Sequence, residues 1–172
     1  MTSNLNKAGL LRQIIQTLEA DLTILFQAAK TAHAAATHAE NVPDNKYATL
    51  GLEASYLAQA QANRAQAIRA ALEAYQRLQL QPFPEGARIR LTALVTLEDE
   101  EGACRTLFLG PEAGGLKLLM GGVEILVITP GSPLGQALLG QVVGDLVNGG
   151  PGGEAGEGKE FEIVAVESVR LS

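Results

Sequence analysis

The chain has 172 residues, of which 47% are hydrophobic and 19% charged, a composition typical of a folded globular protein rather than a disordered one. Its formal net charge of −6 argues against binding free duplex DNA or RNA, which usually needs a dominant basic surface. The single cysteine excludes an internal disulfide, and no segment has the roughly 18 uninterrupted apolar residues of a membrane span. We therefore expect a cytoplasmic protein with no membrane partner.

A change of composition divides the chain near residues 81–84, a Gln-Pro-Phe-Pro segment. Before it the sequence is rich in Ala, Gln, Leu and Glu, which favour helices. After it Gly, Val, Ile, Thr and Pro dominate, which favour strands and turns. This predicts an N-terminal domain over residues 1–80 and a C-terminal domain over residues 85–172.

The first half carries a heptad pattern of apolar residues. Leu11, Leu18 and Leu25 are seven residues apart, and a second row that includes Ile15 and Leu22 runs beside them. Such spacing is typical of a helix that packs along a partner helix. The pattern stops near residue 40.

A second helix is predicted over residues 44–78, because Pro43 suits the first turn of a new helix but not a helix interior. Leu57, Ile68 and Tyr75 fall along one side of it. Two helices of similar length joined by a short loop fold back as an antiparallel hairpin. The tip lies near residues 40–46, and each arm of about 35 residues would reach roughly 50 Å.

The second half predicts an α+β domain: a small antiparallel sheet with one short helix on its face. A short helix is marked by Ser132 as N-cap, Pro133 at the first position and Gly140 just past the end. Cys104 falls in a strand pattern and is expected to be a small buried hydrophobe. The predicted strands cover residues 88–97, 104–109, 123–128 and 161–169.

A long hairpin followed by SPLGQALLGQVVGD at residues 132–145 and FEIVAVE at residues 161–167 resembles the Gre family of transcript cleavage factors. The resemblance implies that the C-terminal domain is FKBP-like and binds the rim of the secondary channel of bacterial RNA polymerase. It also implies that the hairpin passes down that channel to the active centre. The polymerase-binding residues implied in this motif are Ser132, Pro133, Leu134, Gly135, Leu139, Gly140, Gly144 and Asp145.

The hairpin tip departs from the family pattern, which is an Asp, two residues, a Glu-Asn pair and then a Tyr. Asp44, Asn45 and Tyr47 align with it, with one residue missing before the Tyr, but Asn41 stands where the first acid is expected, and the neighbouring acid is Glu40. We hypothesise that Asp44 and Glu40 act as the tip acids, supported by Asn41, Asn45 and Tyr47.

The implied chemistry needs Mg²⁺ held by the polymerase, since Mg²⁺ requires six oxygen ligands and tip carboxylates would complete the shell of a weakly held second ion. The chain would have no cofactor of its own and would not itself be an enzyme. Backtracked RNA would be met inside the polymerase complex. Replacing one acid by Asn leaves two outcomes open, stimulated RNA cleavage or occupation of the channel with altered transcription.

Other interpretations stay open beside this one. Asp44 after Pro43 also suits a helix N-terminus, where a carboxylate complements the helix dipole. An FKBP-type isomerase or chaperone would need an aromatic-lined pocket, for which this half offers Phe83, Phe108 and Phe161. A coiled-coil interaction protein fits the first half but leaves the motif at residues 132–145 unexplained.

Overall fold

The computed structural model describes residues 6–40, 45–149 and 159–167. Contacts divide the chain into two units, one made of residues 15–76 and the other of residues 1–14 together with residues 77–172. None of the described helices combines the length and the apolar character needed to cross a membrane.

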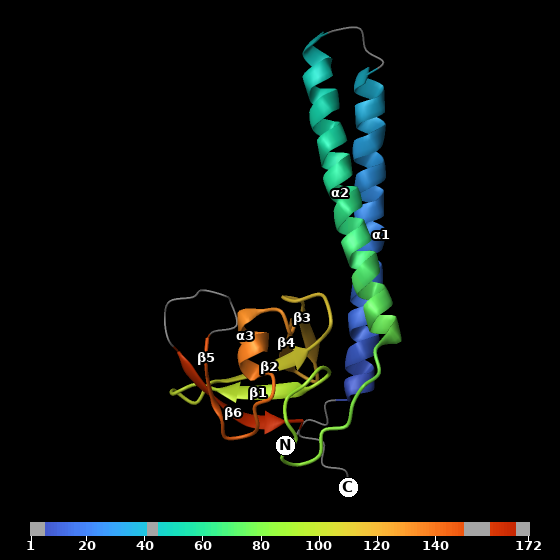
Figure 1. Cartoon of the computed structure of the whole chain (residues 1–172). Helices are drawn as coiled ribbons and strands as arrows, with labels where there is room; N and C mark the ends of the chain where they lie inside the picture. The colour runs from blue at the N-terminus through green and yellow to red at the C-terminus, as the bar shows by residue number, and fades with distance from the viewer. Residues whose placement is uncertain (1–5, 41–44, 150–158, 168–172) are drawn as a thin grey trace. The chain divides into compact units, whose positions relative to one another are not determined.

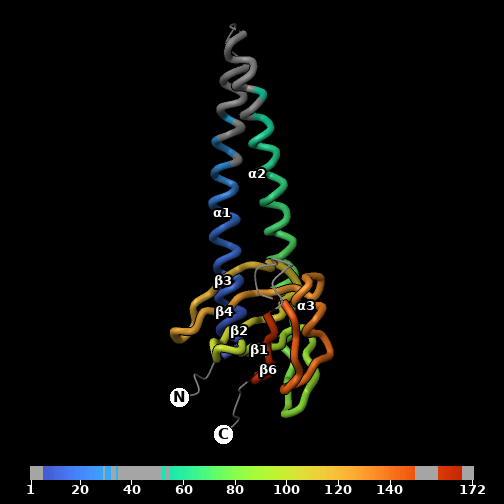
Figure 2. The backbone as a smooth tube through the Cα atoms, turned by 90° about the vertical axis from the view of Figure 1, so that its left-hand side faces the viewer, coloured from blue at the N-terminus to red at the C-terminus, as the bar shows by residue number. Residues whose placement is uncertain are grey.

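The first unit is a hairpin of two long helices, α1 (Lys7–Glu40) and α2 (Asn45–Arg77), which run side by side in both views (Figures 1 and 2). The predicted seam is confirmed at Leu18, which is buried, and Leu22 and Leu25 are half-buried. On α2 the buried positions include Ala65 and Ala71. Small residues allow the two helix backbones to approach closely.

Two seam predictions need correction. Leu57 is 54% exposed, because the buried stripe of α2 follows Ala58, Ala62 and Ala65 and leaves Leu57 outside it. In the first turns of α1, Leu11 is half-buried whereas Leu10 and Ile14 are fully buried. These turns belong to the sheet unit, so they bury a different face.

The second unit contains a six-stranded sheet in the order β3-β4-β2-β1-β6-β5. A short helix, α3 (Pro133–Leu138), lies on one face (Figure 1). The predicted α+β fold class is confirmed. The strands are β1 (Leu94–Glu98), β2 (Cys104–Leu109), β3 (Lys117–Met120), β4 (Val123–Ile128), β5 (Leu146–Asn148) and β6 (Glu160–Val166).

The sequence predicted a wholly antiparallel sheet. The sheet is instead mixed, because β2 and β4 pair in parallel. The Gly121-Gly122 turn, with positive φ at both residues, makes β3 and β4 a tight hairpin. The second strand of that hairpin, β4, pairs with β2, and β3 does not. Residues 110–122 supply the dozen or so residues that a parallel connection requires.

The helix face of the sheet holds the largest hydrophobic core. Leu134 and Leu138 of α3 pack over strand residues that include Leu97, Phe161 and Ile163. On the opposite face, residues such as Phe108 and Ile125 are fully buried. There the first turns of α1 approach the sheet: the Gln13 side chain donates to the Leu119 carbonyl at 3.1 Å.

The strand predicted over residues 88–97 is shorter in the structure, where β1 begins at Leu94. Thr92 has a φ of 77°, which ends an extended run, and Ile89 bonds to the segment after α3 instead of to a strand. Strands β3 and β5 were not predicted. Cys104 is exposed at the start of β2, so the expectation that it is buried is wrong.

Candidate functional site

The hairpin tip is bracketed by Glu40, the last residue of α1, and Asn45, the first residue of α2. Tyr47 lies in the first turn of α2. Residues 41–44, which include Asn41 and Asp44, and the side chains of Glu40, Asn45 and Tyr47 lie outside the described part of the chain. The joint action of Glu40 and Asp44 on a metal, and the capping role of Asp44, both stay predictions.

The start of the C-terminal motif forms a capped helix. Ser132 accepts a hydrogen bond from the Gly135 amide at 3.0 Å and donates to the Thr129 carbonyl at 2.8 Å, with Pro133 at the first helical position. A Cβ on Gly135 would stand 2.0 Å from the Thr129 carbonyl oxygen. Only glycine fits that contact, and Leu134 beside it is buried.

The end of the motif forms two turns. Gly140 and Gly144 have φ values of 82° and 97°, which favour glycine. The Gly140 amide donates to the Ile89 carbonyl and the Gly144 amide to the Ile163 carbonyl, both at 2.8 Å. Asp145 closes the second turn by accepting from the Val142 amide at 2.9 Å. Most of the motif therefore shapes the loop after α3, and Leu139 and Val143 are its exposed large apolar side chains.

Two arginines that are not among the residues predicted from the sequence lie nearby: Arg88 borders this loop, and Arg90 lies against residues 82–83. Arg88 Nη1 donates to the Gly140 carbonyl at 3.0 Å. Arg90 Nη2 donates to the Pro82 carbonyl at 3.0 Å, and its guanidinium lies 5.1 Å from the centre of the Phe83 ring. The signal in the sequence was an Arg-Ile-Arg triplet in a half of the chain that is otherwise rich in acids.

A buried cation lies where α1 begins. The Lys7 ammonium donates to the carbonyls of Gln81 at 2.8 Å and Thr92 at 3.0 Å, lies 4.8 Å from the centre of the Phe83 ring and forms an ion pair with Glu167. Burial raises the pKa of the Glu167 carboxyl, while the hydrogen bond and the charge of Lys7 act to lower it. The cluster ties three distant segments together, and none of its residues lines the three cavities described below, so we assign it a structural role.

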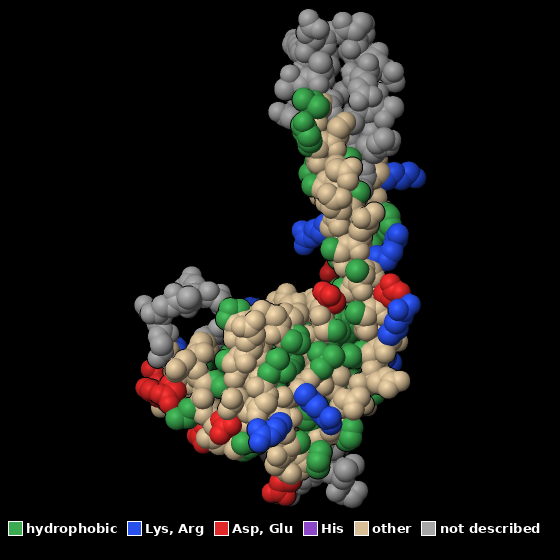
Figure 3. Space-filling view, in the orientation of Figure 1, with side chains coloured by type: hydrophobic (Ala, Val, Ile, Leu, Met, Phe, Trp, Pro, Cys, Tyr) green, Lys and Arg blue, Asp and Glu red, His purple; other side chains and the backbone are tan. Residues whose placement is uncertain are grey.

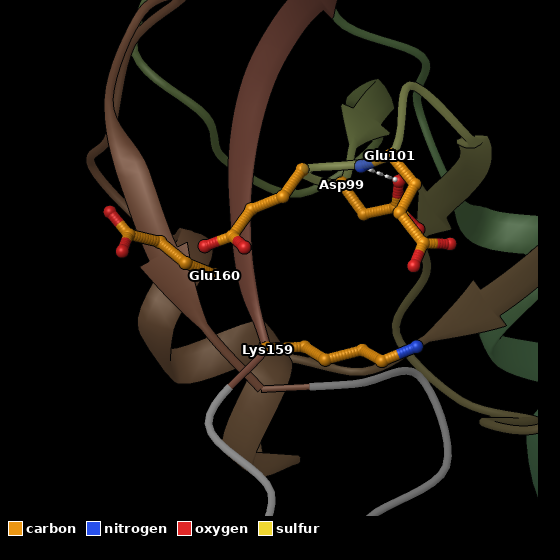
Figure 4. A pocket seen from close by; sticks show the side chains of 5 residues that line it. Asp99, Glu101, Lys159 and Glu160 are labelled. Atoms are coloured by element: carbon orange, nitrogen blue, oxygen red, sulfur yellow. Dashed lines mark hydrogen bonds between the residues drawn. The ribbon is translucent and has the colours of Figure 1, made fainter.

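An acidic cavity of about 120 Å³ lies beside the turn after β1 (Figure 4). Lys159 extends along one side of it, and Glu160 lies on another. Asp99 Oδ1 already accepts from the amides of Glu101 and Ala103, at 2.9 and 2.8 Å, so it shapes the turn. Among the described residues, no group of three or more His, Cys, Asp or Glu side chains could hold a metal ion.

The aromatic residues do not form an open pocket. Phe108 and Phe161 are fully buried, and Phe83 is buried beneath Lys7 and Arg90. The 120 Å³ cavity and two further cavities, of about 300 and 230 Å³, have no aromatic side chain in their walls. This arrangement gives no support to a prolyl isomerase site of the FKBP type.

Several solved structures are similar to this chain. GreA factor homolog 1 (Gfh1) of Thermus thermophilus matches at 25% identity and a TM-score of 0.37, over 91% of this chain and 94% of that one. Gfh1 of Thermus aquaticus matches at 25% identity and 0.36, over 90% and 92%. The transcription elongation factor GreA/GreB from Nitrosomonas europaea matches at 21% identity and 0.33, over 64% and 88%.

These are all Gre-type factors by name. They are the kind of protein that the motifs at residues 132–145 and 161–167 resemble. No protein-family model and no curated protein sequence matches the chain.

Proposed function

We propose that this chain is a Gre-type factor that binds bacterial RNA polymerase, inserts its hairpin into the secondary channel and modulates transcription from there. The observation that carries the proposal is the joining of two features in one chain. Helices of 34 and 33 residues run side by side, each roughly 50 Å long at 1.5 Å per residue. The sheet unit carries the motif at residues 132–145 as a capped helix with two glycine turns.

Asn41 favours modulation over RNA cleavage. An Asn side chain offers Mg²⁺ one neutral oxygen, whereas a carboxylate offers a charged and stronger ligand. A tip that lacks one acid would recruit the second metal of the polymerase weakly. The factor would then act as a Gre-type paralogue that occupies the channel. It would not be an enzyme in its own right.

Stimulated cleavage of backtracked RNA is the second candidate, and Asp44, Asn45 and Tyr47 favour it because they match the family's tip pattern. In that case Glu40 would take the place of the first acid. Replacing Glu40 and Asp44 together by Ala would then abolish RNA shortening. Undiminished shortening would show that these two residues are not the tip acids.

The deciding experiment uses a backtracked elongation complex with end-labelled RNA, incubated with this protein and Mg²⁺. We expect binding and slowed extension without shortening of the RNA. Shortened RNA that can still be extended would establish the cleavage-stimulating candidate instead. A protein that neither binds the complex nor changes its extension would contradict both candidates.

A further inference from the structure

The largest of the three cavities lies where β2 and β4 part, near the beginning of both strands. Its volume is about 300 Å³, and its walls come from β2, β3, β4 and the residue before β2. Strands β2 and β4 pair from Thr106 and Ile125 onward. Cys104 and Arg105 therefore pair with β1 alone, and the side of β2 that would meet β4 is open there.

The charged and apolar walls of this cavity share one face of the sheet. Leu107 of β2 is opposite Leu126 of β4, which is itself opposite Lys117 of β3. Arg105 and Glu124 each lie two residues before a member of that row, so their side chains belong to the same face. Leu107 is buried and Leu126 is half-buried. The cavity therefore combines an aliphatic base with three charged side chains.

The guanidinium of Arg105 is the charged group in this cavity that lacks a partner. In the described part of the chain it forms no hydrogen bond and no ion pair, and its side chain is exposed. Lys117 and Glu124 form an ion pair at 3.8 Å, with side chains 68% and 64% exposed. A pair this exposed contributes little to stability, so a ligand can displace it at small cost. Arg105 thus offers a planar fork of N–H donors of the kind that carboxylates match.

The balance of charge in the walls selects a monoanion. Arg105 and Lys117 against Glu124 leave one net positive charge. A dianion such as a phosphate monoester would be repelled by the Glu124 carboxylate beside it. The other two cavities are lined mainly by acids, and acidic side chains gather at the left edge of the sheet unit in Figure 3. The positive wall is therefore local, and it would draw an anion to this cavity and not to the other two.

We propose that this cavity binds a small aliphatic monocarboxylate. The carboxylate would accept two parallel hydrogen bonds from Arg105, and Lys117 would turn from Glu124 toward the same group. The aliphatic part of the ligand would cover Leu107 and Leu126. A volume of about 300 Å³ is at the small end of ligand pockets, which suits a molecule of this size. The site goes beyond the proposed function and does not depend on it.

The test uses the isotope-labelled full chain with isovalerate as the probe, followed by two-dimensional amide NMR. We expect saturable shifts of the amide signals of Arg105, Thr106 and Leu126. The dissociation constant should lie in the millimolar range, because so small a molecule makes few contacts. Isovaleramide has the same shape without the charge, so it should give no saturable shifts.

Four variants separate the roles of the walls. R105Q should weaken isovalerate binding at least about tenfold, since it removes the charge and the fork, and K117Q should weaken it by a smaller factor. E124Q removes the repelling carboxylate, so it should bind inorganic phosphate at least about tenfold more tightly than wild type does. R64Q changes an exposed arginine of α2 and should bind isovalerate as wild type does.

Cys104 provides a second readout, because it lines the cavity and is the single cysteine of the chain. Bound isovalerate should slow the alkylation of Cys104 by iodoacetamide in wild type, with the concentration dependence found by NMR. In R105Q the same concentrations of isovalerate should leave the rate of alkylation unchanged.

Three results would overturn the proposal. The first is the absence of saturable shifts, and the second is isovalerate binding that R105Q leaves unchanged. The third is equal binding of isovalerate and isovaleramide, because the charge of the ligand would then play no part. None of these results involves the polymerase, so the proposed function stands or fails by its own experiment.

Discussion

Lys7 and Glu167 form a buried ion pair that joins the first turn of α1 to the residue that follows β6. Their side chains are 10% and 5% exposed. The ammonium also has two carbonyl partners and the Phe83 ring, so it is well satisfied without Glu167. The carboxylate has Lys7 as its charged partner, and its pKa is raised because burial outweighs that attraction.

The pKa of Glu167 gives the stability of the sheet unit a predictable pH dependence. A folded-state pKa above the ordinary value of 4.5 means that the folded protein binds the proton more tightly than the unfolded chain does. The contribution of Glu167 to stability is therefore full below pH 4.5 and is lost as pH rises through the folded-state pKa. E167Q cannot titrate and lacks this slope. Urea unfolding of both proteins across the acid range should show the stability of wild type falling relative to E167Q as pH rises; a difference that does not vary with pH would contradict the prediction.

Removing the cation should cost more than removing the acid. Lys7→Met leaves Glu167 buried without a positive partner, which typically costs about 3 kcal/mol of unfolding free energy at neutral pH. The loss of Lys7 also removes what lowers the pKa of Glu167, so the pH dependence should move to higher pH. The double variant K7M/E167L should recover most of the loss in urea unfolding. A double variant as unstable as K7M would show that Lys7 acts through its carbonyl contacts instead.

Gly135 should not tolerate even one methyl group. A Cβ there would stand 2.0 Å from the Thr129 carbonyl oxygen, and backbone cannot move aside as a flexible side chain can. We expect G135A to lower the free energy of unfolding by about 3 kcal/mol. Gly131, four residues earlier, has nothing within 4 Å of the same position, so G131A is a matched control expected to change it by less than about 0.5 kcal/mol.

The tip can be tested by restoring the acid that the family pattern expects. Asn41→Asp adds a carboxylate at the position where Gre cleavage factors carry one, while leaving Glu40 and Asp44 in place. If the missing acid limits recruitment of the second metal, N41D should shorten backtracked RNA faster than wild type does, and the gain should depend on Mg²⁺ concentration. The control N41A should show no gain. Equal rates of RNA shortening for N41D and wild type would show that Asn41 is not what limits cleavage.

Features with local causes were predictable from the sequence. The helix pair follows from heptad spacing and from Pro43, and α3 follows from Ser132, Pro133 and Gly140 within nine residues. Strands β2 and β4 were predicted with the bounds they have, since each is an uninterrupted β-prone run.

Features that depend on distant partners were not predictable. Residues 88–93 alternate like a strand, but the loop after α3 competes for the Ile89 amide and carbonyl. Either strand of the β3–β4 hairpin could have paired with β2, and no local sequence signal shows that β4 does so in parallel. Lys7 and Glu167 form their ion pair although 160 residues separate them in sequence, and Arg88, which contacts Gly140, comes from a segment that resembled a strand.

The sheet unit takes residues from both sides of the hairpin, with Lys7 before it and Gln81, Thr92 and Glu167 after it. Topologically the arm is an insertion in the sequence of a domain that closes without it. Seven-residue steps could be added to or removed from both helices together while the contacts that close the sheet unit stay the same. Evolution could therefore adjust the reach of the arm independently of the sheet unit.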